Sequence, residues 1–161
     1  MNIARQIGVR LELPITVPAY TVNMMCASGM HAVLLAAQAI RAGEAKAILC
    51  GGTESMSNAP YLLPRARTGL KFGNTELVDS LLHDGLIDSF DHRHMTETAE
   101  ALAIDYGISR QEQDAFANLS QQRFEAAKRK GVFDAELTPV GSVIEDQHPR
   151  PETTLEGLAH L

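Results

Sequence analysis

Apolar residues recur every three or four positions in two N-terminal stretches of the chain, which is the period of an α-helix. Residues 1–12 form the first stretch, and they look helical although no capping residue is placed to start the helix. The second stretch predicts a helix over 30–40, followed by Gly43 where a helix C-cap residue belongs. Its apolar positions are Met30, Val33, Leu34, Ala37 and Ile40.

Two apolar segments flank the second predicted helix. Residues 15–23 are rich in β-branched side chains and residues 45–50 form a short apolar run, so both are expected to be strands. A turn-like group, Cys26 to Gly29, links the first segment to the helix. Strand, turn, helix, turn and strand make one βαβ unit, which implies a parallel strand pair with a right-handed crossover. The pattern therefore predicts an α/β fold.

The periodicity weakens over residues 53–95, which contain several Pro and Gly residues among mixed charges. A short helix is expected near 75–82. A segment of this length without clear periodicity is usually functional or a contact between subunits. Farther along, residues 136–140 are expected to form a strand and residues 146–151 a loop.

Helical order returns over 96–106 and ends at Gly107. Ser109 and Glu112 have the spacing of a capping box, in which the serine hydroxyl and the glutamate each satisfy a free backbone N–H. A longer helix is therefore expected from this box to about Lys130, where a glycine follows.

Composition and charge narrow the class of protein. The 161 residues are 45% hydrophobic and 21% charged, which excludes a wholly disordered chain, a collagen and a coiled-coil rod. The net charge of −6 is opposite to the basic footprint of most nucleic-acid binders. Two Cys and six Met without a signal sequence indicate a reducing, cytoplasmic setting. The longest apolar helical stretch is too short to span a bilayer.

Cys26 is the sharpest candidate for chemistry, because it stands at the end of a predicted strand and just before a predicted helix. The free N–H groups and the dipole of a helix start stabilise a thiolate, which is the nucleophilic form of cysteine. The small neighbours Ala27, Ser28 and Gly29 would let a substrate carbonyl approach. The alternative is a buried cysteine that packs as a small hydrophobe. For Cys50, at the end of an apolar segment, that inert interpretation is favoured.

Other polar side chains carry weaker signals. His94 could activate a thiolate or polarise a carbonyl, or it is simply one of a surface group of histidines. His83, His92 and His94 do not have zinc-ligand spacing, so no metal site is expected. Glu54, after a Gly-Gly pair, is best explained as a structural carboxylate that accepts backbone N–H groups in a turn.

Two other classes of protein fit the sequence less well. The predicted helices on either side of residues 107–109 mimic a helix-turn-helix, but the second one is too acidic for a helix that faces phosphates. A thiol redox protein would need a Cys-x-x-Cys pair, which the sequence lacks.

Over essentially its whole length the chain resembles the thiolase family, the acetyl-CoA acyltransferases. The order and spacing of many short stretches carry this resemblance, which makes it more specific than any single motif. The stretches are 22–30 (VNMMCASGM), 51–57 (GGTESMS), 84–86 (DGL), 94–95 (HM), 107–110 (GISR), 112–117 (EQDAFA), Gly131 with Phe133, Asp134 and Glu136, and 154–156 (TLE).

The resemblance implies a thiolase-like α/β fold. It assigns residues 1–57 to a partial βαβ layer of the family's N-terminal core, which carries the nucleophile. Residues 58–161 correspond to a mostly helical loop domain that supplies oligomer contacts and the acyl-CoA pocket. The full-length family members are expected to be homo-oligomers, dimers or tetramers, with no nucleic-acid or membrane partner.

The resemblance also implies roles for single residues. Cys26 matches the cysteine that is acylated in the thiolase cycle, with the helix-start N–H groups holding the thioester oxygen. Leu86, His94 and Met95 match positions near the acyl and pantetheine pocket, and Arg150 matches a position near the adenine end of coenzyme A. The expected activity is acyl transfer between acetyl-CoA and an acyl-CoA, with coenzyme A as substrate and no tightly bound cofactor.

The chain departs from the family pattern in two ways. Met24 and His31 stand where many members have basic residues, and Gly157 stands where the family commonly has Ser. The family's second half, with a Gly-His-Pro histidine and a second catalytic cysteine, has no counterpart in the sequence. The chain alone is therefore expected to be catalytically incomplete. The alternative is a non-catalytic piece that binds acyl-CoA or mediates oligomerisation.

Overall fold

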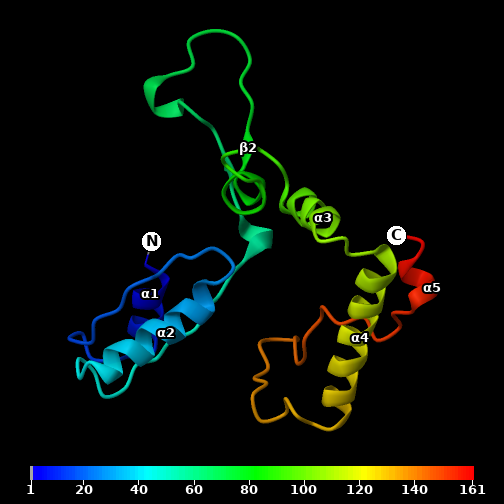
Figure 1. The fold of residues 1–161 in the computed structure, drawn as a ribbon. Coiled ribbons are helices and arrows are strands. Elements are labelled where there is room, and N and C mark those ends of the chain that lie inside the picture. The colour runs from blue at the N-terminus through cyan, green and yellow to red at the C-terminus, as the bar shows by residue number, and fades with distance from the viewer. Residues whose placement is uncertain (1) are drawn as a thin grey trace. The chain divides into compact units, whose positions relative to one another are not determined.

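The computed structural model describes residues 2–161. They form two compact units, the first ending at His92 and the second spanning Arg93–Leu161. The first unit holds the helices α1 (Ile3–Arg10) and α2 (Ser28–Arg41), the strands β1 (Tyr61–Leu62) and β2 (Val78–Asp79), and the short helical turns η1 (Met56–Asn58), η2 (Ala66–Thr68) and η3 (Leu82–Leu86) (Figure 1). The second unit holds α3 (Met95–Asp105), α4 (Arg110–Arg129) and α5 (Leu155–Leu158).

The first helix has a cap that the sequence pattern did not predict. Asn2 is the N-cap residue of α1, and its side-chain oxygen accepts the Arg5 N–H at 3.0 Å. The expectation of an uncapped start is therefore wrong, since asparagine is among the strongest N-cap residues. The Arg5 guanidinium donates to the carbonyls of Val17 (2.8 Å) and Ile15 (3.2 Å), which ties α1 to the segment that follows it.

The helix of the predicted βαβ unit is confirmed, whereas its two strands are not formed. The α2 helix ends at Arg41, and Gly43 adopts the left-handed φ of 76° expected beyond a helix C-terminus. At 15–23, the Val17 N–H turns back to Pro14 O at 2.8 Å, so this part is a turn. A strand also needs a hydrogen-bonded neighbour, and in residues 2–161 neither 15–23 nor 45–50 is paired in a ladder.

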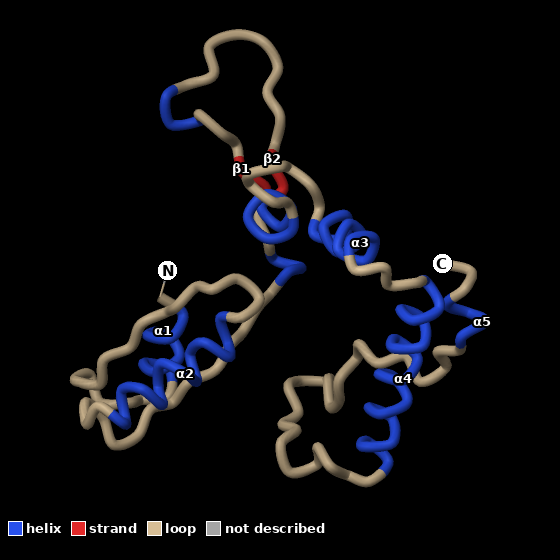
Figure 2. The backbone as a smooth tube through the Cα atoms, viewed as in Figure 1, coloured by secondary structure: helices blue, strands red, loops and turns tan. Residues whose placement is uncertain are grey.

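One of the two strands that do form, β2, lies where a helix was expected. Tyr61 pairs with Asp79 and Leu62 with Val78 in a short antiparallel ladder between β1 and β2. The long connection between them is mostly loop (Figure 2). The expected helix near 75–82 is therefore wrong in its first part. Helical turns begin only after β2, at Ser80, and lead into the π-helical turn η3.

The strand expected over 136–140 is likewise absent from the residues described. Leu137 donates back to Phe133 O at 3.1 Å, and Val140 exchanges two backbone hydrogen bonds with Val143 across a tight turn. Local turns thus take the backbone groups that a strand would offer to a neighbour. The loop expected over 146–151 is confirmed.

The two longer helices of the second unit, α3 and α4, follow the sequence prediction closely. Gly107 has a φ of 63° and ends α3. Glu112 accepts the Ser109 N–H at 2.8 Å and donates its own N–H to Ser109 Oγ at 3.3 Å, which confirms the capping box of α4. The Arg110 guanidinium donates to the carbonyl of Leu158, which places α5 beside the start of α4 (Figure 1).

The capping box makes the stability of α4 depend on pH. Hydrogen bonds from the Ser109 backbone and side chain lower the pKa of Glu112 below its ordinary value of 4.5. A carboxyl whose pKa is lowered by folding stabilises the folded state above its unfolded pKa, and this contribution is lost as the pH falls through the folded value. We expect the helical circular dichroism signal to decline as the pH falls below 4.5, and Glu112→Gln to remove that part of the decline. Glu152→Gln is the matched control, and an unchanged profile in Glu112→Gln would contradict this account.

Candidate functional site

Cys26 lies in a tight turn immediately before α2, and its side chain is exposed. The residue before it, Met25, has a φ of 50°, in the left-handed region that side chains other than glycine seldom adopt. The Ala27 N–H donates to Met24 O at 3.1 Å, and the Ser28 N–H donates to Met25 O at 3.0 Å. The chain therefore reverses sharply at the cysteine and presents the sulfur at the helix start.

Two polar side chains bracket this turn. Ser28 Oγ accepts the Met24 N–H at 2.8 Å and donates to Met25 O at 2.6 Å. Asn23 Oδ1 accepts the Met25 N–H at 2.9 Å. Both residue types readily bond to nearby backbone groups. They are the local residues that sequence analysis missed, although Asn and Ser so close to Cys26 at a predicted helix start would have been a signal for them.

The start of α2 keeps backbone donors available. The first intrahelical bond of this turn runs from the His31 N–H to Ala27 O at 2.9 Å, and Ala27 makes no side-chain cap. Within residues 2–161 no protein acceptor takes the Gly29 and Met30 N–H groups. Free N–H groups at a helix N-terminus favour a negatively polarised oxygen. Chemically, the segment offers an exposed thiol in the turn that precedes these two donors.

The Gly-Gly pair lies against this same turn. A Cβ added to Gly52 would lie 3.3 Å from Gly29 Cα, which is tighter than most Cβ contacts, so the two backbones pack closely here. Next along the chain, Glu54 Oε1 accepts the Ser55 N–H at 2.9 Å. This bond agrees with the expected role of Glu54 as a structural carboxylate in a turn.

Leu86 closes the π-helical turn η3 and is half-buried. Single π-helical turns are rare in proteins, and those that occur are often found at functional sites. The Ile87 N–H donates to Leu82 O at 2.9 Å and ends the turn. In the same turn, His83 Nδ1 lies 2.7 Å from Asp84 Oδ1, with both side chains 66% exposed. This exposed pair adds little rigidity, so the backbone turn positions Leu86.

His94 and Met95 open the second unit's first helix. His94 is the N-cap residue of α3, where its Nδ1 accepts the Thr96 N–H at 3.2 Å and its own N–H donates to Glu97 Oε2 at 3.0 Å. With Nδ1 used as an acceptor, the neutral ring carries its proton on Nε2. Met95 follows as the first helical residue and is 51% exposed.

Arg150 bonds mainly to its own loop. Its Nη1 donates to the carbonyls of Gln147 (3.2 Å), His148 (2.7 Å) and Pro149 (3.2 Å), while its backbone N–H donates to Gln121 Oε1 at 2.8 Å. The bond to Gln121 anchors the loop on α4, and the other three hold the loop together. The Nη2 and Nε groups remain available, so loop anchoring and ligand contact are compatible in this side chain.

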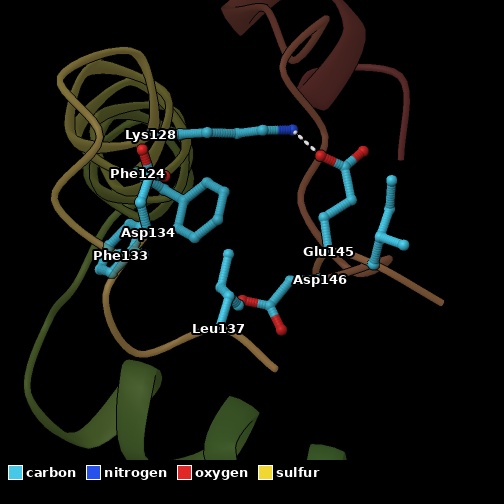
Figure 3. Close-up of a pocket in the computed structure, with 8 residues that line it drawn as sticks. Phe124, Lys128, Phe133, Asp134, Leu137, Glu145 and Asp146 are labelled. Carbon is cyan, nitrogen blue, oxygen red and sulfur yellow. Dashed lines mark ion pairs between the residues drawn. The ribbon is translucent and has the colours of Figure 1, made fainter. Parts of the chain in front are cut away.

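A hollow of the second unit holds none of the predicted site residues (Figure 3). It has a volume of about 210 Å³ and lies between α4 and the loop that follows it. Phe124 and Phe133 stack there with ring centroids 5.4 Å apart. Lys128 Nζ lies 2.7 Å from Glu145 Oε2, and this hydrogen bond raises the pKa of Lys128. The aromatic stack and the ion pair serve to hold the loop on the helix.

Cys50 differs from the sequence prediction. It is exposed, and not a buried thiol, because the segment that carries it forms no strand. In residues 2–161 no three His, Cys, Asp or Glu side chains are grouped so as to hold a metal ion. None of the helices described there has the length and apolar character needed to cross a membrane.

Comparison with protein families gives a match to the model described as Thiolase, N-terminal domain, over residues 1–161. The acetyl-CoA acetyltransferase of Pseudomonas aeruginosa is 50% identical in a match that covers 99% of this chain and 43% of the relative. The acetyl-CoA acetyltransferase of Chromobacterium violaceum is 51% identical over 86% of this chain and 36% of its own length.

A solved structure matches as well. The crystal structure of human mitochondrial 3-ketoacyl-CoA thiolase in complex with CoA superposes with a TM-score of 0.89 at 42% sequence identity. The match covers 98% of this chain and 41% of that protein. The chain thus spans less than half the length of the relatives it matches.

Proposed function

The chain belongs to the thiolase family, and we propose that it supplies the acyl-accepting half of a thiolase reaction, in which Cys26 takes an acetyl or acyl group from coenzyme A. The family match over residues 1–161 and the thiolase-like α/β fold are the premise. The observation that carries the proposal is local: an exposed thiol in a strained turn beside two free helix-start N–H groups.

The proposed step follows from this geometry. Cys26 Sγ, as the thiolate, forms a bond to the carbonyl carbon of the thioester, and the carbon–sulfur bond to coenzyme A then breaks. The proton that left Cys26 ends on the departing coenzyme A thiol. The negative charge that develops on the carbonyl oxygen is stabilised by the Gly29 and Met30 N–H groups, as in an oxyanion hole.

The remaining site residues are proposed as contacts to the substrate. Leu86 and Met95 would contact the acyl and pantetheine chain, and His94 would offer its Nε2 proton to an oxygen of the same chain. Arg150 would contact the adenine end of coenzyme A with the nitrogens that do not hold its loop. Coenzyme A and acyl-CoA are thus the proposed substrates, and no tightly bound cofactor takes part.

The proposal extends to organisation and setting. Residues 1–57 would form the nucleophile-bearing core and 58–161 the loop domain, with the full-length protein a homo-oligomer in a reducing, cytoplasmic compartment.

One observation favours the second candidate function, a non-catalytic piece for binding or assembly. Ala36, 8% exposed, is the only buried residue in the part of the chain described, so most apolar side chains are left for other surfaces to cover.

Loading from acetyl-CoA tests the proposed function. The purified chain should gain one acetyl group per molecule in intact mass spectra, because one thiol is placed at a helix start. Neutral hydroxylamine should remove the group, since it cleaves thioesters and spares amides. A folded chain that gains no acetyl group, or gains one that resists hydroxylamine, would contradict the proposal and favour the non-catalytic candidate.

A further inference from the structure

We infer that Ser28 is a positioning residue for Cys26, because its hydroxyl holds the strained turn that presents the sulfur at the start of α2. The catalytic meaning of this inference rests on the proposed function. The turn itself can be tested without any acyl-CoA.

The need for such a residue comes from Met25. Its φ of 50° lies in a region that is strained for a non-glycine residue and persists only where the surroundings enforce it. The Met25 side chain is 56% exposed, so core packing does not enforce this conformation. Hydrogen bonds around the residue have to do so.

Ser28 supplies hydrogen bonds on both sides of the strained residue. Its Oγ accepts the Met24 N–H at 2.8 Å and donates to Met25 O at 2.6 Å, so one hydroxyl holds the Asn23–Met24 and the Met25–Cys26 peptide groups. Asn23 adds a bond to the Met25 N–H at 2.9 Å. Ser28 is half-buried and is the first residue of α2, which makes the rigid helix the anchor of the turn.

The direction of the Ser28 hydroxyl has a second consequence. The side chain that commonly accepts N–H groups of the first turn is that of the N-cap residue, which is Ala27 here and has no acceptor. Here the Oγ bonds point back along the chain to Met24 and Met25. The Gly29 and Met30 N–H groups are left without a protein acceptor among residues 2–161. Ser28 therefore holds the turn without occupying the neighbouring donors.

The rate at which iodoacetamide alkylates Cys26 reports on this arrangement. The alkylation rate of Cys50 in the same molecule is the internal reference. Both thiols are exposed, so the ratio of the Cys26 rate to the Cys50 rate reports on the turn and not on access to solvent. We expect Ser28→Ala to lower this ratio about fivefold, the size of a helix-terminus interaction with a charge. Ser28→Thr keeps the hydroxyl and should stay within about twofold of the natural chain.

A double variant separates positioning from general stability. Glycine adopts a positive φ without strain, so Met25→Gly combined with Ser28→Ala should recover at least half of the lost ratio. Alanine is a better helix former than serine, so α2 should be retained, and circular dichroism checks this. The inference is overturned if Ser28→Ala leaves the ratio unchanged, if Ser28→Thr falls equally far, or if Met25→Gly restores nothing.

The two levels of the proposal fail separately. In one outcome, acetyl-CoA does not acetylate the natural chain, but the alkylation ratio still falls in Ser28→Ala and recovers in the double variant. This outcome overturns the acyl-transfer function and supports the positioning role. A chain that is acetylated at Cys26 equally fast with Ser28 or Ala overturns the positioning role alone.

Discussion

Replacing Cys26 by alanine is expected to abolish the exchange of labelled coenzyme A into acetyl-CoA, with a loss of at least about 100-fold. The exchange needs only the acyl-accepting step and its reversal, in which the acetyl group passes to the protein thiol and back to free coenzyme A. Without the sulfur no acyl-protein forms. The remaining binding groups and helix-start donors cannot replace a covalent nucleophile.

Cys50→Ala is the matched control for this loss. Cys50 is also a free, exposed thiol, but it has no helix start beside it. We expect its replacement to leave exchange within about twofold, because a small surface side chain is removed without loss of a partner. Equal losses in the two variants would show that exchange depends on thiols in general and would contradict the assignment to Cys26.

The second large effect concerns the complete reaction. This chain alone should cleave acetoacetyl-CoA no faster than buffer does. Its cleavage rate should be at least about 100-fold below its rate of coenzyme A exchange, because positioned acid–base groups accelerate a reaction by that factor or more. Thiolysis needs a base for the attacking thiol and an acid for the α-carbon as well as the nucleophile. In residues 2–161 no imidazole or carboxylate is hydrogen-bonded to Cys26 Sγ.

The measurement is the fall in acetoacetyl-CoA absorbance, with Cys26→Ala as the control for a contaminating thiolase. Background cleavage should be the same with either residue at position 26. Turnover that survives repurification and disappears in Cys26→Ala would show that this chain contains the full catalytic set, contrary to our account.

The helices and their ends were largely predictable because their signals are local. The apolar period located α2, and the Ser109–Glu112 spacing located the start of α4. Gly43 and Gly107 marked helix ends because a positive φ suits glycine. Asn2 also caps a helix through a local bond, but it lies at the edge of the apolar pattern, where that pattern does not mark a helix start.

The strands were not predictable in the same way. Residues 15–23 have a composition typical of strands, but composition does not supply the neighbour that a ladder requires. Cys50 was expected to be buried for the same reason, and it is exposed because that segment is unpaired. Of the candidate site, the position of Cys26 before a helix was predictable. The bonds of Ser28 to Met24 and Met25 were not, because they depend on the conformation of the turn.

The most direct test of the account is to find which cysteine carries the acetyl group. The chain is incubated with acetyl-CoA, its fold is checked by circular dichroism, and its peptides are mapped by mass spectrometry. We expect the group on the peptide that contains Cys26 and none on the peptide that contains Cys50. A folded chain with no acetyl group, or with equal labelling of both thiols, would contradict the claim that the start of α2 forms an acyl-accepting site.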